Sequence, residues 1–102
     1  MSDIRVLVVD DHSVVREGIR SVLATPGFSV VGEAGSGEEA LQLAAQLRPD
    51  VILLDISMPG TSGLHIVERL RHDVPASRIL ILSVHDRTEY VLAAIPLGGY
   101  VK

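Results

Sequence analysis

The chain has 102 residues, with nine Lys and Arg against thirteen Asp and Glu and a formal net charge of -4. This length suits one domain with a single core, and scattered basic residues in an acidic chain argue against a nucleic-acid-binding surface. The absence of cysteine excludes disulfides and thiolate chemistry. Because no basic segment precedes a long apolar run at the start, we expect no signal peptide, no membrane span and a cytoplasmic location.

The first half of the chain alternates apolar runs with helical patterns. Residues 4–9 indicate a buried strand, and Ser13 is suited to cap the helix that follows. The apolar stripe expected to be buried on that helix is Val15, Ile19, Val22 and Leu23. Residues 28–32 indicate a second strand, and Ser36 with Glu39 forms a capping box for a helix to about Leu47. Its inward residues are predicted to be Ala40, Leu43, Ala44 and Leu47.

The second half repeats this rhythm. Residues 51–55 read Val-Ile-Leu-Leu-Asp, which indicates a strand buried on both faces. A helix from Ser62 and Gly63 to about Arg71 should turn Ile66, Val67 and Leu70 inward, and residues 79–82 indicate a fourth strand. A helix from about Arg87, with Val91, Leu92 and Ile95 on its apolar face, should end before Pro96. Residues 99–102 would begin a fifth strand.

Strict alternation of strands and helices predicts a flavodoxin-like, doubly wound α/β fold with five parallel strands in the order 2-1-3-4-5. We expect one domain over residues 1–102 that lacks the last helix of this fold. One face of the first and fifth strands should then expose apolar surface, to be covered by a further C-terminal segment or by a partner. This strand order brings four polar residues to one edge of the sheet: Asp10, Asp11, Asp55 and Ser83.

Three carboxylates in one shallow site repel one another unless a cation lies among them. Mg2+ suits such a site because it takes one or two carboxylates, a backbone carbonyl and several waters. We expect Asp11 and Asp55 as direct ligands, the Ser57 carbonyl as a third, and Asp10 acting mostly through water. The Asp55 carboxylate could then attack phosphorus to form an aspartyl phosphate, with the Ser83 hydroxyl donating to a phosphoryl oxygen.

Three spaced segments carry a family resemblance: Val8-Val9-Asp10-Asp11-His12, then 48–59 with Gly63, then Leu82-Ser83-Val84-His85-Asp86. Together they resemble the receiver domain of bacterial two-component response regulators over nearly the whole chain. The first and last segments are most similar to the subfamily whose receivers precede a helix-turn-helix DNA-binding domain, which would lie outside this chain.

The resemblance implies a phosphorylation-dependent switch rather than an enzyme with turnover. Asp55 would accept phosphate from a sensor histidine kinase, Asp10 and Asp11 would serve the Mg2+, and Ser83 would follow the phosphate. Tyr100 would change rotamer, and a Lys on the fifth strand, here Lys102, would contact the phosphate. DNA would be contacted only through the absent domain, and a homodimer on activation is compatible with this scheme.

The end of the chain departs from the family pattern. The family has two residues between the aromatic and the Lys, whereas only Val101 separates Tyr100 from Lys102. Residues two apart share a face of a strand, so both cannot occupy their family positions in a regular strand. Either a bulge corrects the register at Lys102, or residues are missing between Ile95 and Lys102.

Other interpretations remain open from the sequence. A free-standing phosphorelay receiver would carry the same residues. A Mg2+-dependent phosphohydrolase would need a general acid two residues after its nucleophile, where this chain has Ser57. A nucleotide or flavin binder would need a phosphate-cradling loop, but the glycines in 32–37 indicate a turn. The histidines, at 12, 65, 72 and 85, lack zinc spacing, and the segment around Val14, Val15 and Gly18 either docks a kinase helix or packs in the core.

Overall fold

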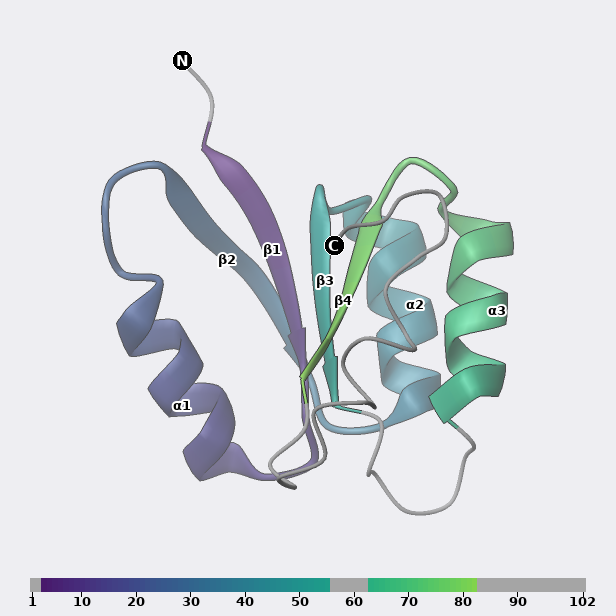
Figure 1. Ribbon diagram of the computed structural model, residues 1–102, viewed down its shortest axis with the longest axis horizontal. Helices are drawn as coiled ribbons and strands as arrows, with labels where there is room; N and C mark the ends of the chain where they lie inside the picture. Colours follow the sequence, from purple (N-terminus) through teal and green to yellow (C-terminus); the bar gives the residue numbers. More distant parts are fainter. Residues whose placement is uncertain (1–2, 56–62, 83–102) are drawn as a thin grey trace.

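The computed structural model describes residues 3–55 and 63–82. Four strands, β1 (Ile4–Val9), β2 (Phe28–Ala34), β3 (Val51–Asp55) and β4 (Arg78–Leu82), form a parallel sheet in the order β2-β1-β3-β4. They alternate with α1 (Ser13–Val22), α2 (Gly37–Leu47) and α3 (Gly63–Asp73), as Figure 1 shows. This confirms the flavodoxin-like α/β prediction for the described residues. The helix predicted from Arg87 and the fifth strand lie outside them.

The predicted element boundaries differ from the observed ones by one or two residues. β2 continues two residues past Gly32 to Ala34, α3 continues two past Arg71 to Asp73, and β4 begins one residue before Ile79. In the part of the chain that the structure describes, no helix is long and apolar enough to cross a membrane.

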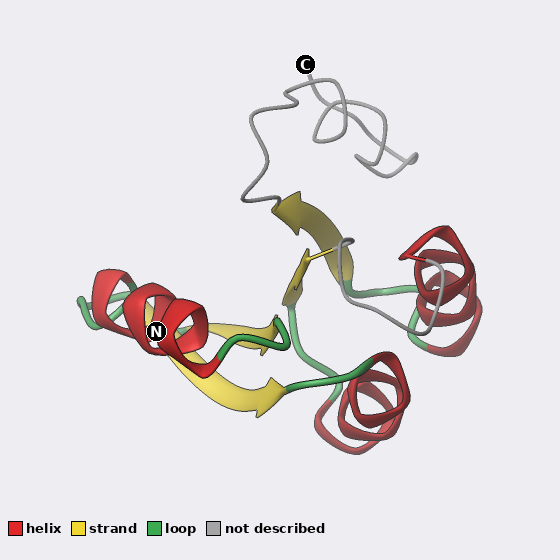
Figure 2. Cartoon of the chain, turned by 90° about the horizontal axis from the view of Figure 1, so that it is seen from below, coloured by secondary structure: helices red, strands yellow, loops and turns green. Residues whose placement is uncertain are grey.

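The main core lies between the sheet and the pair α2 and α3, which cover one face while α1 lies on the other (Figure 2). Because side chains alternate along a strand, every second residue of β1, β3 and β4 points into this core. These residues are Leu7, Val9, Ile52, Leu54, Ile79 and Ile81, each at most 1% exposed. The inward residues predicted for α3 are buried, and on α2 Ala40 and Ala44 are buried while Leu43 and Leu47 are half-buried.

The buried stripe predicted for α1 is wrong as stated. No residue of α1 is buried; Val15, Ile19 and Leu23 are half-buried, and Val22 is 77% exposed. The physical reason is that α1 is the only helix of the described residues on its side of the sheet, so one flank of its apolar stripe has no described neighbour. Helical periodicity identifies the apolar face but not how much of it is covered.

The cap predicted for α1 is also wrong. His12, not Ser13, is the N-cap, and its side chain makes no capping hydrogen bond to the helix. The N–H of Arg16 donates to the carbonyl of His12 at 3.1 Å, which starts the helical pattern one residue earlier than predicted. Ser13 is therefore the first helical residue.

The apolar surface expected on the first strand is absent. Val6 and Val8 point to the α1 side of the sheet but are only 2% and 0% exposed. α1 packs against β1 on this face, and β2 and β3 cover the two edges of the strand. On the same side, Leu80 and Leu82 of β4 are 46% and 39% exposed. The corresponding prediction for the fifth strand lies outside the described residues.

The connection between β2 and α2 follows the predicted capping pattern. The hydroxyl of Ser36 accepts the N–H of Glu39 at 3.2 Å, and the Glu39 carboxylate accepts the N–H of Gly35 at 2.8 Å. α2 ends at Leu47 and is followed by the C-cap residue Arg48, whose φ of 46° is left-handed. Earlier on β2, Gly32 lies under this helix, and a Cβ added there would be 2.8 Å from Cδ1 of Leu47.

Asp73 ends α3 beside two basic side chains. Nδ1 of His72 lies 3.1 Å from one carboxylate oxygen, and Nη2 of Arg69 lies 3.6 Å from the other. The hydrogen bond with His72, followed by the charge of Arg69, lowers the pKa of the Asp73 carboxyl. The charged form of Asp73 is thus favoured in the folded state.

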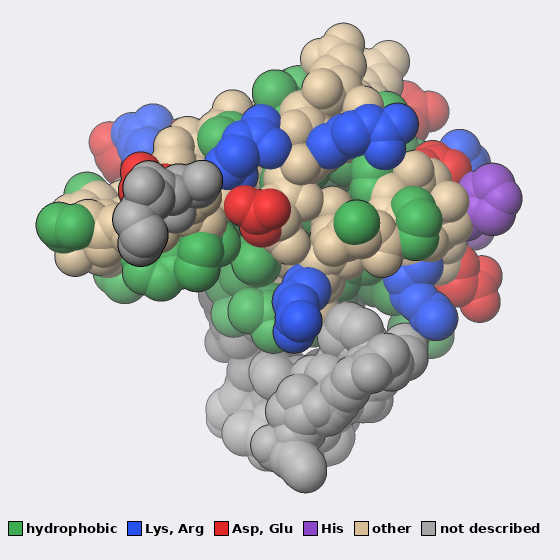
Figure 3. Space-filling view, turned by 90° about the horizontal axis from the view of Figure 1, so that it is seen from above, with side chains coloured by type: hydrophobic (Ala, Val, Ile, Leu, Met, Phe, Trp, Pro, Cys, Tyr) green, Lys and Arg blue, Asp and Glu red, His purple; other side chains and the backbone are tan. Residues whose placement is uncertain are grey.

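The strands begin at a basic end of the sheet. Arg5 donates from Nη1 to the carbonyl of Arg48 and from its N–H to the Asp50 carboxylate, both at 2.8 Å. Figure 3, which looks onto this end, shows Arg side chains around an acidic one. The strands therefore start at a predominantly basic end and run toward an acidic one.

Candidate functional site

The register of the two central strands brings Asp10 and Asp55 together. β1 pairs with β3 so that Val9 lies opposite Leu54, and one further step places Asp10 level with Asp55. Both carboxylates end buried strands, and the two residues are only 3% and 2% exposed. Two acidic residues that follow apolar runs are thus held side by side by the packing of those runs.

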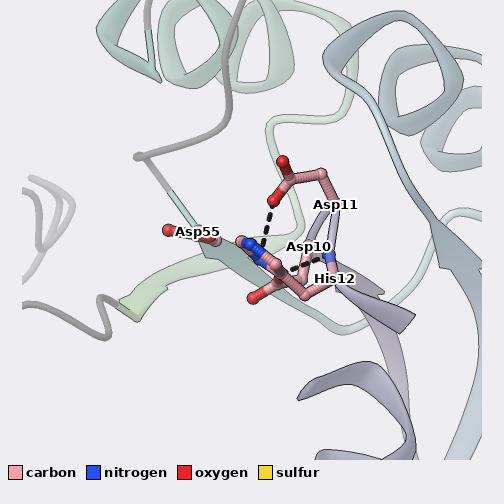
Figure 4. Close-up of side chains that lie close together, drawn as sticks. All are labelled: Asp10, Asp11, His12 and Asp55. Atoms are coloured by element: carbon pink, nitrogen blue, oxygen red, sulfur yellow. Dashed lines mark hydrogen bonds and ion pairs between the residues drawn. The ribbon is translucent and has the colours of Figure 1, made fainter. Parts of the chain in front are cut away.

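Asp10 is fixed through both its backbone and its side chain. Its N–H donates to the carbonyl of Ala34 at 3.0 Å. Its Oδ1 accepts the N–H of His12 at 2.8 Å and lies 3.1 Å from Nδ1 of the same residue. Figure 4 shows the imidazole between the carboxylates of Asp10 and Asp11, with Asp55 beside them at the end of β3.

His12 lies against both loop carboxylates. Its Nδ1 is 2.9 Å from Oδ1 of Asp11, although its side chain is 59% exposed. The hydrogen bond with Asp10 and then the charge of Asp11 raise the pKa of His12, because both favour the imidazolium. The two carboxylates therefore favour a positive charge at this point of the site.

The arrangement fits a divalent cation. Asp10, Asp11, His12 and Asp55 each offer one ligand atom, and these atoms lie within 4.8 Å of one another. Oδ1 of Asp11 is shielded from solvent, and the His12 imidazole, at 2.9 Å, is its neighbour among the described residues. Three carboxylates are the oxygen donors that hard cations such as Mg2+ prefer, and the imidazole also suits transition metals.

The structure thus places three of the predicted site residues, Asp10, Asp11 and Asp55, in one cluster. The other predicted site residues lie outside the described ones: Ser57, Ser83, Tyr100 and Lys102. The predicted irregularity of register between Tyr100 and Lys102 also lies outside them. His12, for which the sequence indicated no metal spacing, lies in this cluster in space.

Arg16 is a residue beside the site that the sequence did not single out. Its Nη1 donates to the backbone carbonyl of Asp10 at 2.5 Å, and its Nε donates to Glu33 at 3.2 Å. The sequence held one signal for this role. A basic residue in the first turn of a helix lies at the positive end of the helix dipole, so Arg16 needs an acceptor or an acidic partner nearby.

Residues 6–101 match the family model described as the response regulator receiver domain. The chain belongs to this family. Receiver domains are signalling modules that bind Mg2+ through a cluster of acidic residues and are phosphorylated by histidine kinases. Family membership favours a receiver over the nucleotide or flavin binder and the phosphohydrolase considered from the sequence.

Individual relatives agree with this assignment. The receiver is 46% identical over 100 residues to the nitrate/nitrite response regulator NarP of Escherichia coli strain K12. The alignment covers 95% of this chain but only 46% of NarP. The chain therefore spans about half the length of such curated relatives.

Two solved structures share the fold. The signal receiver domain of NarL from Mycobacterium tuberculosis superposes with a TM-score of 0.80 and 38% identity, covering 90% of this chain and 75% of that one. RcsB of Salmonella enterica serovar Typhimurium, bound to the rprA promoter in the presence of the phosphomimetic BeF3-, gives a TM-score of 0.76 and 27% identity, covering 83% of this chain and 44% of that one.

Proposed function

We propose that this receiver is a phosphorylation-dependent switch in which Asp55 accepts a phosphoryl group from a phosphohistidine of a sensor kinase. The observation that carries the proposal is the position of Asp55, a 2% exposed carboxylate at the end of the central strand β3, clustered with Asp10 and Asp11. Because β3 is covered on both faces of the sheet, a phosphoryl donor can reach Asp55 only from the carboxyl end of the strands. α/β folds of this kind bind their ligands at that end.

In the proposed transfer, an Asp55 carboxylate oxygen attacks phosphorus while the P–N bond to the kinase histidine breaks. The bonding electrons go to the imidazole nitrogen, which then takes up a proton. Hydrolysis reverses the modification, because water attacks phosphorus and the P–O bond to Asp55 breaks. The chain thus acts only on its own phosphoryl group.

Mg2+ in this site would offset the charges of the carboxylates and of the phosphoryl oxygens. Asp11 and Asp55 are proposed as direct ligands. Asp10 is proposed to act mostly through water, and this is supported by the two His12 nitrogens, which lie 2.8 and 3.1 Å from its Oδ1.

The proposal extends to four residues beyond the described ones. The Ser57 carbonyl would be the third metal ligand, and the Ser83 hydroxyl would donate to the phosphoryl group. Lys102 would pair with the phosphate, and Tyr100 would report its presence by a change of rotamer.

We further propose that residues 1–102 form a single receiver domain, incomplete at its C-terminal end, in a cytoplasmic transcriptional regulator. The support is that NarP, of which the chain spans 46%, is a response regulator, and that RcsB is seen on a promoter with a phosphomimetic. In the full-length protein, phosphorylation of Asp55 would control a helix-turn-helix output domain that contacts DNA.

Incubation of the chain with Mg2+ and acetyl phosphate, followed by intact mass spectrometry, tests the proposal. We expect the mass to rise by one phosphoryl group in the wild type and in Asp50→Asn, a matched change at the opposite end of the sheet. Asp55→Asn should not be modified. Labelling of Asp55→Asn to the wild-type extent, or catalytic release of phosphate from small esters, would contradict it.

A further inference from the structure

Arg16 joins three elements of the fold at the edge of the acidic site. From α1 its guanidinium reaches the carbonyl of Asp10 at the end of β1, at 2.5 Å, and the carboxylate of Glu33 on β2, at 3.2 Å. The Arg16 side chain is only 21% exposed. The guanidinium also lies beside Gly35, where an added Cβ would be 3.4 Å from Nη1, an ordinary van der Waals contact.

Glu33 holds the guanidinium in this orientation. Its second oxygen accepts from Nη1 of Arg20 at 2.7 Å, so the carboxylate is fixed between two arginines of α1. Arg20 differs from Arg16 because, among the described residues, it pairs with Glu33 but makes no hydrogen bond or ion pair with the acidic site. The two arginines thus share a partner, but only Arg16 touches the backbone beside the cluster.

The carbonyl that Arg16 binds belongs to the peptide unit between Asp10 and Asp11. The Asp10 N–H is held by Ala34, at 3.0 Å, while Arg16 holds the following carbonyl. Because a peptide unit is planar, the direction of this carbonyl sets where the chain carries Asp11 as it leaves the sheet. The contact therefore orients a residue that Arg16 does not itself touch.

A charge effect and a positioning effect of Arg16 have opposite signs for cation binding. A guanidinium near the carboxylates repels an incoming cation, so loss of its charge alone should tighten Mg2+ binding. Loss of the hydrogen bond to Asp10 should weaken binding, because the Asp11 carboxylate would no longer be held in place. The direction of the change in affinity separates the two effects.

We propose that Arg16 is a positioning residue of the site, which sets the Asp10–Asp11 peptide so that Asp11 can bind the metal. This inference rests on the proposed function, since it assumes that Asp10, Asp11 and Asp55 hold Mg2+. Outer-shell partners that orient metal ligands typically contribute about 10- to 100-fold in metal affinity.

Isothermal titration of the chain with Mg2+ tests this, with thermal unfolding of each metal-free variant beside it. Arg16→Lys keeps the charge but loses the planar fork that serves Asp10 and Glu33 together. We expect both Arg16→Lys and Arg16→Ala to bind Mg2+ about 10-fold or more weakly. Arg20→Ala, which removes the other guanidinium on Glu33, should leave the affinity within about twofold of the wild type.

Wild-type affinity in Arg16→Lys, tighter binding in Arg16→Ala, or an equal loss in Arg20→Ala would overturn the inference. Should Arg16→Ala fail to fold, Arg16→Lys against Arg20→Ala still decides it. Absence of Mg2+ binding by the wild type would instead contradict the proposed function, so the two failures are distinguishable.

Discussion

Neutralising Asp55 should stabilise the metal-free receiver while removing its response to Mg2+. Asp55→Asn keeps the size of the side chain but leaves two carboxylates, those of Asp10 and Asp11, where there were three. Since buried like charges oppose folding, the free energy of unfolding should rise. This is the reverse of what most substitutions at a 2% exposed position do.

The size of the effect follows from the spacing of the cluster. The ligand atoms lie within 4.8 Å of one another. At that separation two unit charges repel by about 0.9 kcal/mol in a water-like dielectric and by about 3.5 kcal/mol at an effective dielectric constant of about 20. His12 offsets part of this through Asp10 and Asp11, so we expect a net gain of about 1 to 3 kcal/mol for Asp55→Asn.

Urea unfolding followed by circular dichroism measures this, since the chain has no Trp for fluorescence. With Mg2+ at about 100 times its dissociation constant the wild type should gain about 2.7 kcal/mol, and the variant should gain far less. Glu68→Gln, which removes one exposed charge from α3, serves as the control and should change stability little. An Asp55→Asn variant that is less stable than the wild type without Mg2+ would refute the reasoning.

Four further substitutions are checked by the same unfolding assay. Gly32→Ala should lose about 1 kcal/mol by overpacking, because its new methyl lies 2.8 Å from Leu47, whereas Gly18→Ala, in open space on α1, should gain about 0.5 to 1 kcal/mol. Ser36→Ala should lose about 1 kcal/mol with the cap of α2. Because the pKa of Asp73 is lowered on folding, its stabilising contribution is present above the ordinary value of 3.8 and is lost as the pH falls through the folded value. The stability advantage of the wild type over Asp73→Asn should therefore shrink in acid, and a constant difference would contradict this.

The parts of the fold that sequence predicted well depend on local patterns. The run from Val51 to Leu54 has the length and composition of a buried central strand, and it forms one. Strand and helix alternate without interruption, which limits the topology enough to predict that Asp10 and Asp55 meet at one edge. Ser36 and Glu39 are three residues apart, and their capping contact needs no information from the rest of the chain.

Apart from the cap of α1, which is misplaced by one residue, the predictions that failed depend on neighbours distant in sequence. The apolar stripe of α1 is real, but its burial depends on what else packs on that side of the sheet, which periodicity does not contain. Likewise, Arg16 meets Glu33 across 17 residues and meets Asp10 through the backbone, and its place in the first turn of α1 indicates that it needs a partner but not which one. His12 entered the site for the same reason, because its position depends on where the chain turns after Asp10.

The acidic site depends on the register of β1 and β3 as much as on its own residues. Leu7 and Val9 point into the core with Ile52 and Leu54, so Asp10 and Asp55, one residue further along their strands, both point to the opposite side of the sheet. A slip of one residue between these strands would send one carboxylate into the core and separate the pair. The core side chains fix the register because their burial is lost in any other pairing. Core packing on the α2 and α3 side therefore determines the geometry of a site that lies beyond the ends of the strands.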